Sequence, residues 1–351
     1  MLSMTLEYKK KIIVLGTGGT IAGKSAVTSD NVGYRASQIG VKQLLDAIPS
    51  LVDANGDAAY GRCELVCEQV SQIDSKDMNF EVWQRLLARC QHWLAQESVV
   101  GIVITHGTDT LEETAFFLHC TLATHKPVVL TCAMRPATAL APDGPQNLLD
   151  ALAVATAGVV SGEKLGEKLG VVAVCAGVIH SAVDVQKVHN YRLDAFSSGD
   201  AGALGYVKEG KLEIHRKYEL NSHVAGVFIA SAAINNIAKL VSLSDDLPRV
   251  EIVLNHSGAT GAIVEALLAQ RQTATSHKLA GIVVAATGNG TISKDLEIAL
   301  QTAESAGVVV WRSTRCVFGA LVGKADAQFG DSGGLTPVKA RVALMLKLAV
   351  G

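Results

Sequence analysis

The sequence contains no long apolar run and no long run of a single charge. None of its apolar stretches reaches the roughly 20 residues that a membrane-spanning helix requires. Its 31 basic and 33 acidic residues give a formal net charge of −2 at pH 7, and the basic residues form neither long runs nor an amphipathic stripe. We therefore expect neither a membrane nor a nucleic acid as partner.

Cysteine is scarce and scattered. The chain has seven cysteines, an odd number, and Cys63 and Cys67 lack the second pair that a zinc site would need. An export signal is not expected, because the apolar run after residues 9–11 is short and leads into a glycine turn without a small-residue cleavage site. These features favour reduced thiols in a cytoplasmic protein.

The 351 residues, 49% of them hydrophobic, suffice for one large domain or two smaller ones. In the first 206 residues, predicted strands alternate with predicted helices. The strands are 12–15, 64–73, 101–104, 127–130 and 169–174, and the helices are 41–48, a segment from 80, a segment from 111 and 147–157. This alternation predicts an α/β fold with a mostly parallel sheet and crossover helices on both faces.

The periodic pattern weakens after residue 206 and resumes near residue 248. Further strands are predicted at 251–254, 280–286 and 308–311, with helices at 261–270, 293–306 and 337–348. We predict an N-terminal catalytic α/β domain (1–206), a linker (207–247) and a smaller C-terminal α/β domain (248–351).

The glycine turn at 16–20 follows the first predicted strand. It does not fit the dinucleotide fingerprint, because Ile21 occupies the place of the third glycine. Residues 18–25 match a phosphate loop, but we reject that match because 26–33 shows no helical periodicity. What remains is the Thr20 hydroxyl at a strand end, among glycines that let backbone approach a ligand closely.

A predicted strand changes abruptly into a helix within residues 101–118. Thr110 and Glu113 fit a capping box, which places Thr108 and Asp109 at the N-terminal end of the helix. Free backbone N–H groups favour negative charge there. A hydroxyl and a carboxylate are therefore expected side by side.

His106, Asp109 and Glu112 are of types that can bind metals. We interpret them as oriented turn residues, because the first precedes the helix and the others lie at or after its start. Thr20, Ser75 and Thr108, by contrast, each follow a predicted strand. Ligands of parallel sheets bind beyond the carboxyl ends of strands, so we predict that these three hydroxyls share one site.

Six motifs combine into one pattern: Gly18-Gly19-Thr20-Ile21-Ala22-Gly23, Ser75 with Asp77-Met78-Asn79, Thr105-His106-Gly107-Thr108-Asp109-Thr110 with Glu112-Glu113-Thr114, Ala133-Met134-Arg135-Pro136, Asp143-Gly144-Pro145, and Asp184-Val185-Gln186-Lys187. The pattern resembles that of bacterial-type L-asparaginases and glutaminase-asparaginases. The resemblance spans nearly the whole chain, and two separate threonine motifs in the right order make it specific. It implies an L-asparaginase, most similar to the cytoplasmic type.

The resemblance also implies catalytic roles. Thr20 and Thr108 would be the two catalytic threonines, with Tyr34 beside the first on a polar loop able to close over the site. Lys187 and Asp109 would complete a triad with Thr108. Threonine is a weak nucleophile and an amide a poor electrophile, so the hydroxyl needs a proton acceptor and the oxyanion needs donors. The implied route is acyl transfer to Thr20, loss of ammonia and hydrolysis by water, with no metal or organic cofactor.

For the substrate, the resemblance implies that Ser75 holds the α-carboxylate, Asp109 the α-ammonium, and the Ala133 backbone the amide. Lys76 departs from the pattern, because periplasmic members carry glutamine or glutamate there. Two unit charges about 4 Å apart interact by roughly 4 kcal/mol at an effective dielectric constant of about 20. Lys76 must therefore turn outward or meet the substrate's carboxylate, and preference between L-asparagine and L-glutamine stays open.

The C-terminal domain departs from the pattern as well. Two residues that reach a neighbouring subunit's site in periplasmic members, an asparagine and a glutamate, have no clear equivalents here. Gly258 falls near the first position, and residues 318–327 offer no glutamate for the second. Asn255, His256 and Asp326 are candidate substitutes. Family members usually form tetramers from pairs of intimate dimers, so a homodimer or homotetramer is expected.

Three alternatives to an L-asparaginase remain. The first is a glutaminase-asparaginase of mixed specificity, and the second is a non-catalytic homologue that binds an amino acid. The third is the related amidotransferase subunit that supplies ammonia for charging transfer RNA. That subunit carries an extra N-terminal domain, for which a first strand at residue 12 leaves no room.

Overall fold

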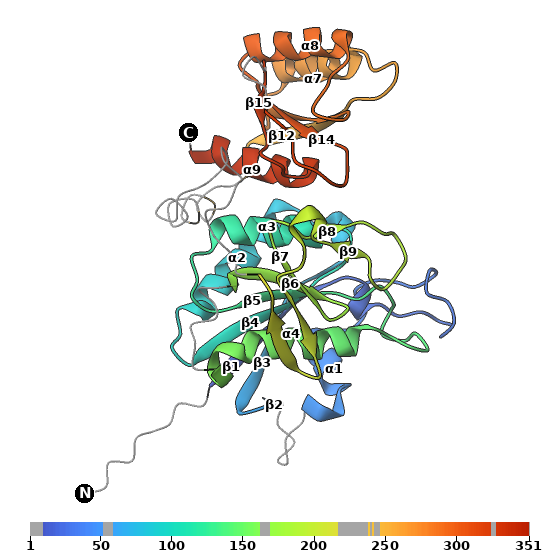
Figure 1. Cartoon of the computed structure of the whole chain (residues 1–351), viewed down its shortest axis with the longest axis vertical. Helices are drawn as coiled ribbons and strands as arrows, with labels where there is room; N and C mark the ends of the chain where they lie inside the picture. The colour runs from blue at the N-terminus through green and yellow to red at the C-terminus, as the bar shows by residue number, and fades with distance from the viewer. Residues whose placement is uncertain are drawn as a thin grey trace, which may run out of the picture. The chain divides into compact units, whose positions relative to one another are not determined.

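The computed structural model describes residues 10–51, 59–161, 169–216, 238, 241, 246–323 and 328–350. The chain divides into two compact units, Met1–Tyr218 and Glu219–Gly351 (Figure 1). None of the described helices is long and apolar enough to cross a bilayer.

The first unit is built on a mixed, mostly parallel sheet. Its described strands, in spatial order, are β11 (Lys211–Ile214), β10 (Gly205–Lys208), β7 (Val178–Ser181), β6 (Val171–Cys175), β5 (Val128–Thr131), β4 (Val99–Thr105), β1 (Lys11–Gly18), β3 (Cys63–Ile73) and β2 (Ala59–Tyr60). The central strands β6, β5, β4, β1 and β3 are parallel, and the outer pairings are antiparallel. The prediction of a mostly parallel sheet is confirmed.

Helices cover both faces of this sheet, with α2 and α3 on one face and α1 and α4 on the other (Figure 1). Their bounds are α1 (Val41–Asp46), α2 (Phe80–Leu94), α3 (Leu111–Thr121) and α4 (Gly144–Ser161). In β1, residues 12–15 are fully buried, as a strand covered on both faces requires. Short 3-10 turns follow β1 and β3, namely η1 (Thr20–Ala22) and η3 (Ser75–Asp77).

Two predictions for this unit need correction. Residues 207–208 and 211–214, predicted as the start of a linker, lie in strands β10 and β11, and β10 pairs with β7. The sequence pattern did not predict these strands because they are short and most of their residues are exposed or half-buried. Most of the remaining predicted linker, 217–247, falls outside the described residues.

The predicted capping box at the start of α3 is also wrong. Thr110 is the N-cap residue, but its side chain makes no capping hydrogen bond. Its hydroxyl instead donates to the Ser75 carbonyl oxygen at 2.8 Å. A tertiary partner has replaced the local one, and as a result the start of α3 is attached to the turn after β3.

The second unit is a smaller α/β structure, as predicted. Its described strands form a parallel sheet in the order β12 (Arg249–Leu254), β13 (Leu279–Ala286), β14 (Val309–Thr314) and β15 (Gly330–Asp331). Helices α7 (Ala262–Thr273) and α8 (Lys294–Ser305) lie on one face, and α9 (Pro337–Val350) lies on the other (Figure 1).

Candidate active site

The loops that follow β1 and β4 meet through two glycines. Gly19 has a φ of 83°, and a Cβ atom at this position would lie under 3 Å from the backbone of Gly107. A Cβ atom on Gly107 would in turn lie under 3 Å from the Ser75 hydroxyl. The absence of side chains at both positions brings the segments carrying Thr20, Ser75 and Thr108 together.

Thr20 is the first residue of η1, and its side chain is buried. Its Oγ1 atom lies 2.6 Å from the hydroxyl of Tyr34. Burial raises the pKa of Tyr34 above its ordinary value, while the hydrogen bond to Thr20 acts in the opposite direction. At neutral pH Tyr34 is therefore a protonated phenol next to the threonine hydroxyl.

The segment that carries Tyr34 is attached to the rest of the unit at both ends. The hydroxyl of Ser37 accepts a hydrogen bond from Gly19 N at 2.8 Å. Near the other end, Thr138 accepts from Ser25 N at 2.8 Å, and Leu140 N donates to the Thr28 carbonyl oxygen at 3.0 Å. These contacts hold Tyr34 over Thr20.

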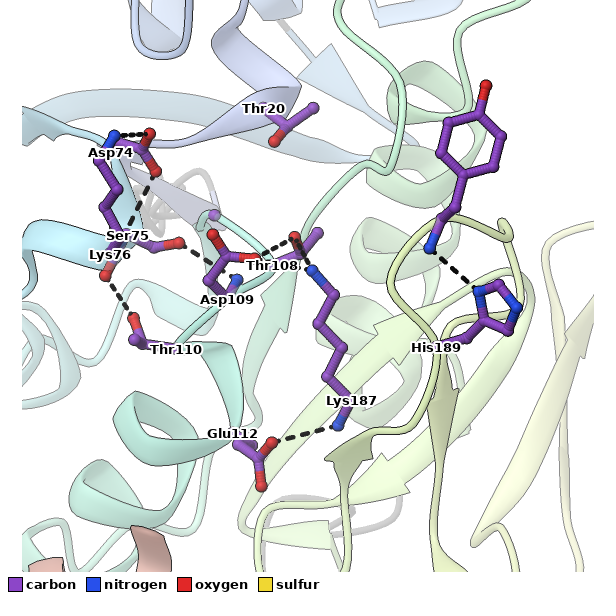
Figure 2. Close-up of polar contacts among 12 residues, drawn as sticks. Thr20, Asp74, Ser75, Lys76, Thr108, Asp109, Thr110, Glu112, Lys187 and His189 are labelled. Atoms are coloured by element: carbon purple, nitrogen blue, oxygen red, sulfur yellow. Dashed lines mark hydrogen bonds and ion pairs between the residues drawn. The ribbon is translucent and has the colours of Figure 1, made fainter. Parts of the chain in front are cut away.

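Thr108, Asp109 and Lys187 form a second hydrogen-bonded group. The Lys187 Nζ atom donates to Thr108 Oγ1 at 2.8 Å and to Asp109 Oδ1 at 2.7 Å (Figure 2). Lys187 lies in β8 (Gln186–Lys187), which pairs with β9 (Phe196–Ser197). Its side chain is 17% exposed, whereas that of Asp109 is 55% exposed. The carboxylate thus lies at the open side of the group.

Ser75 connects the turn after β3 to this group. Its buried hydroxyl accepts a hydrogen bond from Asp109 N at 3.2 Å. The neighbouring Lys76 points away from Asp109 and forms a 2.6 Å ion pair with Asp74 (Figure 2). The Lys76 side chain is 64% exposed. Of the two orientations expected for this lysine, the structure has the outward one.

Ala133 lies in the turn after β5 and is buried. The carboxylate of Asp143 holds this turn by accepting hydrogen bonds from Met134 N and Arg135 N, both at 2.9 Å. The amide of Asn147 donates to the Cys132 carbonyl oxygen at 2.9 Å. Asp143-Gly144-Pro145 is a motif of the resemblance, but its contacts to the turn after β5 were not predicted. Ser37 was not predicted, because a serine in a polar loop carries no signal of its partner.

His106 directly follows β4 and is fully buried. Its Nδ1 atom donates to the Gly107 carbonyl oxygen at 2.7 Å, and burial lowers its pKa to about 4. Within the described residues, no group of three or more histidine, cysteine or acidic side chains is arranged to hold a metal ion. The buried imidazole is neutral at pH 7 and acts as a hydrogen-bond donor to the turn before Thr108.

This burial predicts a loss of stability in acid. Below pH 6.5 the unfolded chain binds a proton on His106 that the folded chain excludes until about pH 4. The free energy of unfolding should therefore fall by about 2 kcal/mol from this group between pH 7 and pH 5. His106→Asn keeps a donor near the Nδ1 position without the titration. Urea unfolding at both pH values should show a smaller acid loss in the variant, and an equal loss would contradict the prediction.

The candidate residues of the second unit do not form a comparable group. Asn255 is buried and binds within its own unit, donating to Thr287 and Thr291 and accepting from Ser293 N. His256 is exposed, and its Nδ1 atom donates to the Ser257 carbonyl oxygen. Gly258 has a φ of 73°. Asp326 lies outside the described residues.

Comparison with known proteins gives consistent matches over both units. The family profile described as "Asparaginase, N-terminal" matches residues 11–220, and that described as "Glutaminase/Asparaginase C-terminal domain" matches residues 249–351. A solved structure described as the probable cytoplasmic L-asparaginase from Campylobacter jejuni is similar at a TM-score of 0.82 and 36% identity, covering 98% of this chain and 96% of the other.

Curated relatives cover nearly the full chain as well. The probable periplasmic L-asparaginase of Haemophilus influenzae is 37% identical, and L-asparaginase 2 of Escherichia coli is 36% identical. Each alignment covers 96% of this chain and 88% of the relative. The glutaminase-asparaginase of Pseudomonas fluorescens is 34% identical over 98% of this chain and 88% of its own length.

Proposed function

The chain belongs to the asparaginase family of amidohydrolases and is an L-asparaginase, and we propose that it forms L-aspartate and ammonia through a threonine nucleophile and an acyl-enzyme. One observation carries this proposal. Two threonine hydroxyls, each hydrogen-bonded to a proton-carrying side chain, lie on loops that meet at Gly19 and Gly107.

In the first half-reaction, Thr20 Oγ1 attacks the carboxamide carbon. The Tyr34 hydroxyl, 2.6 Å away, accepts the threonine proton as it passes its own proton to the departing nitrogen. This relay suits a phenol that remains protonated at neutral pH. The C–N bond breaks, ammonia leaves, and an ester joins the substrate acyl group to Thr20.

In the second half-reaction, water attacks the ester carbonyl and its proton returns to Thr20 Oγ1 as the C–O bond breaks. Thr108 orients this water, with its hydroxyl fixed by Lys187 Nζ at 2.8 Å. The positive end of the α3 dipole favours the negative charge that develops on the carbonyl oxygen.

Substrate recognition follows from the charged and polar groups around Thr108 and Asp109. Asp109 Oδ1 contacts Lys187, and we assign its Oδ2 atom to the substrate's α-ammonium group. We assign the Ser75 hydroxyl to the α-carboxylate and the Ala133 backbone to the amide. Lys76 lies at the rim with its charge balanced by Asp74, so its ammonium group does not oppose a substrate ammonium beside Asp109.

A glutaminase-asparaginase of mixed specificity is the second candidate, because proteins of that name are among the relatives. Ammonia release from L-asparagine, L-glutamine and D-asparagine, measured on purified protein, separates the two. We expect the largest kcat/KM for L-asparagine. Equal values for the two L-amides would favour the mixed enzyme, and no release from any would favour an amino-acid-binding homologue.

The acyl-enzyme is tested separately. Acid-quenched reaction mixtures are digested, and mass spectrometry should find an aspartyl adduct on the peptide containing Thr20. Hydroxylamine added during turnover should yield aspartyl hydroxamate in competition with aspartate. An adduct on a different residue would remove Thr20 as the nucleophile.

We further propose a cytoplasmic homodimer or homotetramer. All seven cysteines are free thiols, which is usual in a reducing compartment. The structural relative from Campylobacter jejuni is described as cytoplasmic, although the relative from Haemophilus influenzae is described as periplasmic. Light scattering coupled to size exclusion would give the number of subunits.

A further inference from the structure

Glu112 contacts Lys187, the lysine whose side chain is hydrogen-bonded to Thr108. It lies in the first turn of α3 and is 8% exposed. Its Oε1 atom accepts a hydrogen bond from the backbone N–H of Lys187 at 3.2 Å (Figure 2). The two residues are 75 positions apart in the sequence, so this contact joins α3 to β8.

The backbone and the side-chain end of Lys187 are therefore both held by one short segment, residues 108–112. Its Nζ atom binds Thr108 and Asp109, and its backbone N–H binds Glu112, four residues further along. Figure 2 shows the lysine side chain extended between these two points. Both attachment points move together, because they belong to one continuous turn and helix start.

The strand that carries Lys187 does not by itself fix this geometry. β8 has only two residues and pairs with the equally short β9 in a two-stranded sheet separate from the main one. A lysine side chain has four rotatable bonds, so the place of its Nζ atom depends on where its backbone lies. The contact with Glu112 sets the backbone of Lys187 relative to Thr108.

A glutamate suits this position for two reasons. Its negative charge lies in the first turn of α3, where the helix dipole favours an anion. A carboxylate is also a stronger acceptor than a neutral oxygen for the Lys187 N–H. Glu113, the next residue, also carries an acidic side chain in the first turn of α3, so it controls for the loss of an acidic group at this end of the helix.

We propose that Glu112 is a positioning residue that aligns Lys187 with Thr108 for hydrolysis of the substrate amide. This inference rests on the proposed function, in which Lys187 orients Thr108. Glu112 itself touches no reacting atom in this scheme. Its main effect is expected on kcat, because the backbone of Asp109 is held by the Ser75 hydroxyl independently of Glu112. A smaller effect on KM is expected, because Lys187 also contacts the Asp109 carboxylate.

The test compares Glu112→Ala, Glu112→Gln and Glu113→Ala in the full-length protein. Glu112→Ala removes the acceptor, and we expect kcat for L-asparagine to fall by about 30-fold or more, with KM changed by less than about threefold. Glu112→Gln keeps an oxygen at the same place and should retain kcat within about threefold. Glu113→Ala should do the same.

Thermal unfolding and L-aspartate binding show whether each variant is folded at the assay temperature. Among variants that fold, Glu112→Gln keeps the acceptor oxygen that Glu112→Ala removes. An equal loss of kcat in both would show that the hydrogen bond to the Lys187 N–H does not explain the loss, and it would overturn the proposal. An alanine variant with kcat within about threefold of the parent would also overturn it. If Glu112→Ala does not fold, a folded Glu112→Gln variant with kcat lowered by more than about threefold would still overturn the proposal.

A double-mutant comparison separates this inference from the proposed function. Lys187→Met alone should lower kcat strongly, and adding Glu112→Ala should cost little more, since the side chain to be positioned is gone. An undiminished kcat in Lys187→Met would contradict the proposed function. A normal loss in Lys187→Met with a full additional loss from the Glu112 change would contradict only the positioning role.

Discussion

Thr20→Ala is expected to abolish ammonia release from L-asparagine while leaving the binding of L-aspartate measurable. The side chain removed is the only group proposed to bond covalently to the substrate, and Tyr34 would lose the hydroxyl that it contacts at 2.6 Å. Loss of a nucleophile that acts together with a proton carrier lowers kcat by roughly 10⁴-fold or more. The assay is coupled ammonia detection at saturating substrate.

Thr20→Ser is the matched control, because it keeps the hydroxyl and removes only a methyl group. We expect it to retain measurable turnover and to form the same acyl adduct. The Gly19–Gly107 contact depends on backbone atoms, so neither variant should disturb the fold. Undiminished turnover in Thr20→Ala would remove Thr20 from the mechanism.

The sheet could be predicted because burial leaves a strong pattern in the sequence. Fully buried parallel strands require continuous apolar runs, and β1, β4 and β5 consist of such runs. Strands β10 and β11 were not predicted because they are short and lie at the edge of the sheet, where most of their residues are exposed or half-buried. A short half-exposed strand is hard to distinguish from a connecting segment.

The meeting of the two threonine segments was also predicted, since parallel strands end at the same edge of a sheet. The individual hydrogen bonds that join these segments were not predicted. Thr110 bonds to Ser75 instead of capping α3, and Glu112 reaches a residue 75 positions away. Both partners are set by how distant segments pack, and a local sequence pattern carries no information about them.

Gly19→Ala is expected to disable the site through the backbone. A Cβ atom at this position would lie under 3 Å from Gly107, and a φ of 83° is unfavourable for alanine. The segments carrying Thr20 and Thr108 would have to separate. A displacement of about 1 Å can cost about 100-fold in rate, so kcat should fall at least that far. The free energy of unfolding should fall by about 2–5 kcal/mol.

Gly202→Ala isolates the effect of the close approach. Gly202 has a φ of 72°, but a Cβ atom there would meet no atom within 4 Å. This variant therefore carries only the backbone penalty of about 1–3 kcal/mol and should keep its kcat. If Gly19→Ala instead matched Gly202→Ala in both urea unfolding and kcat, the two threonine segments would not be held together by the contact between Gly19 and Gly107. Their alignment would then depend on other contacts, such as the pairing of β1 with β4 and the side-chain hydrogen bonds of Ser37 and Ser75.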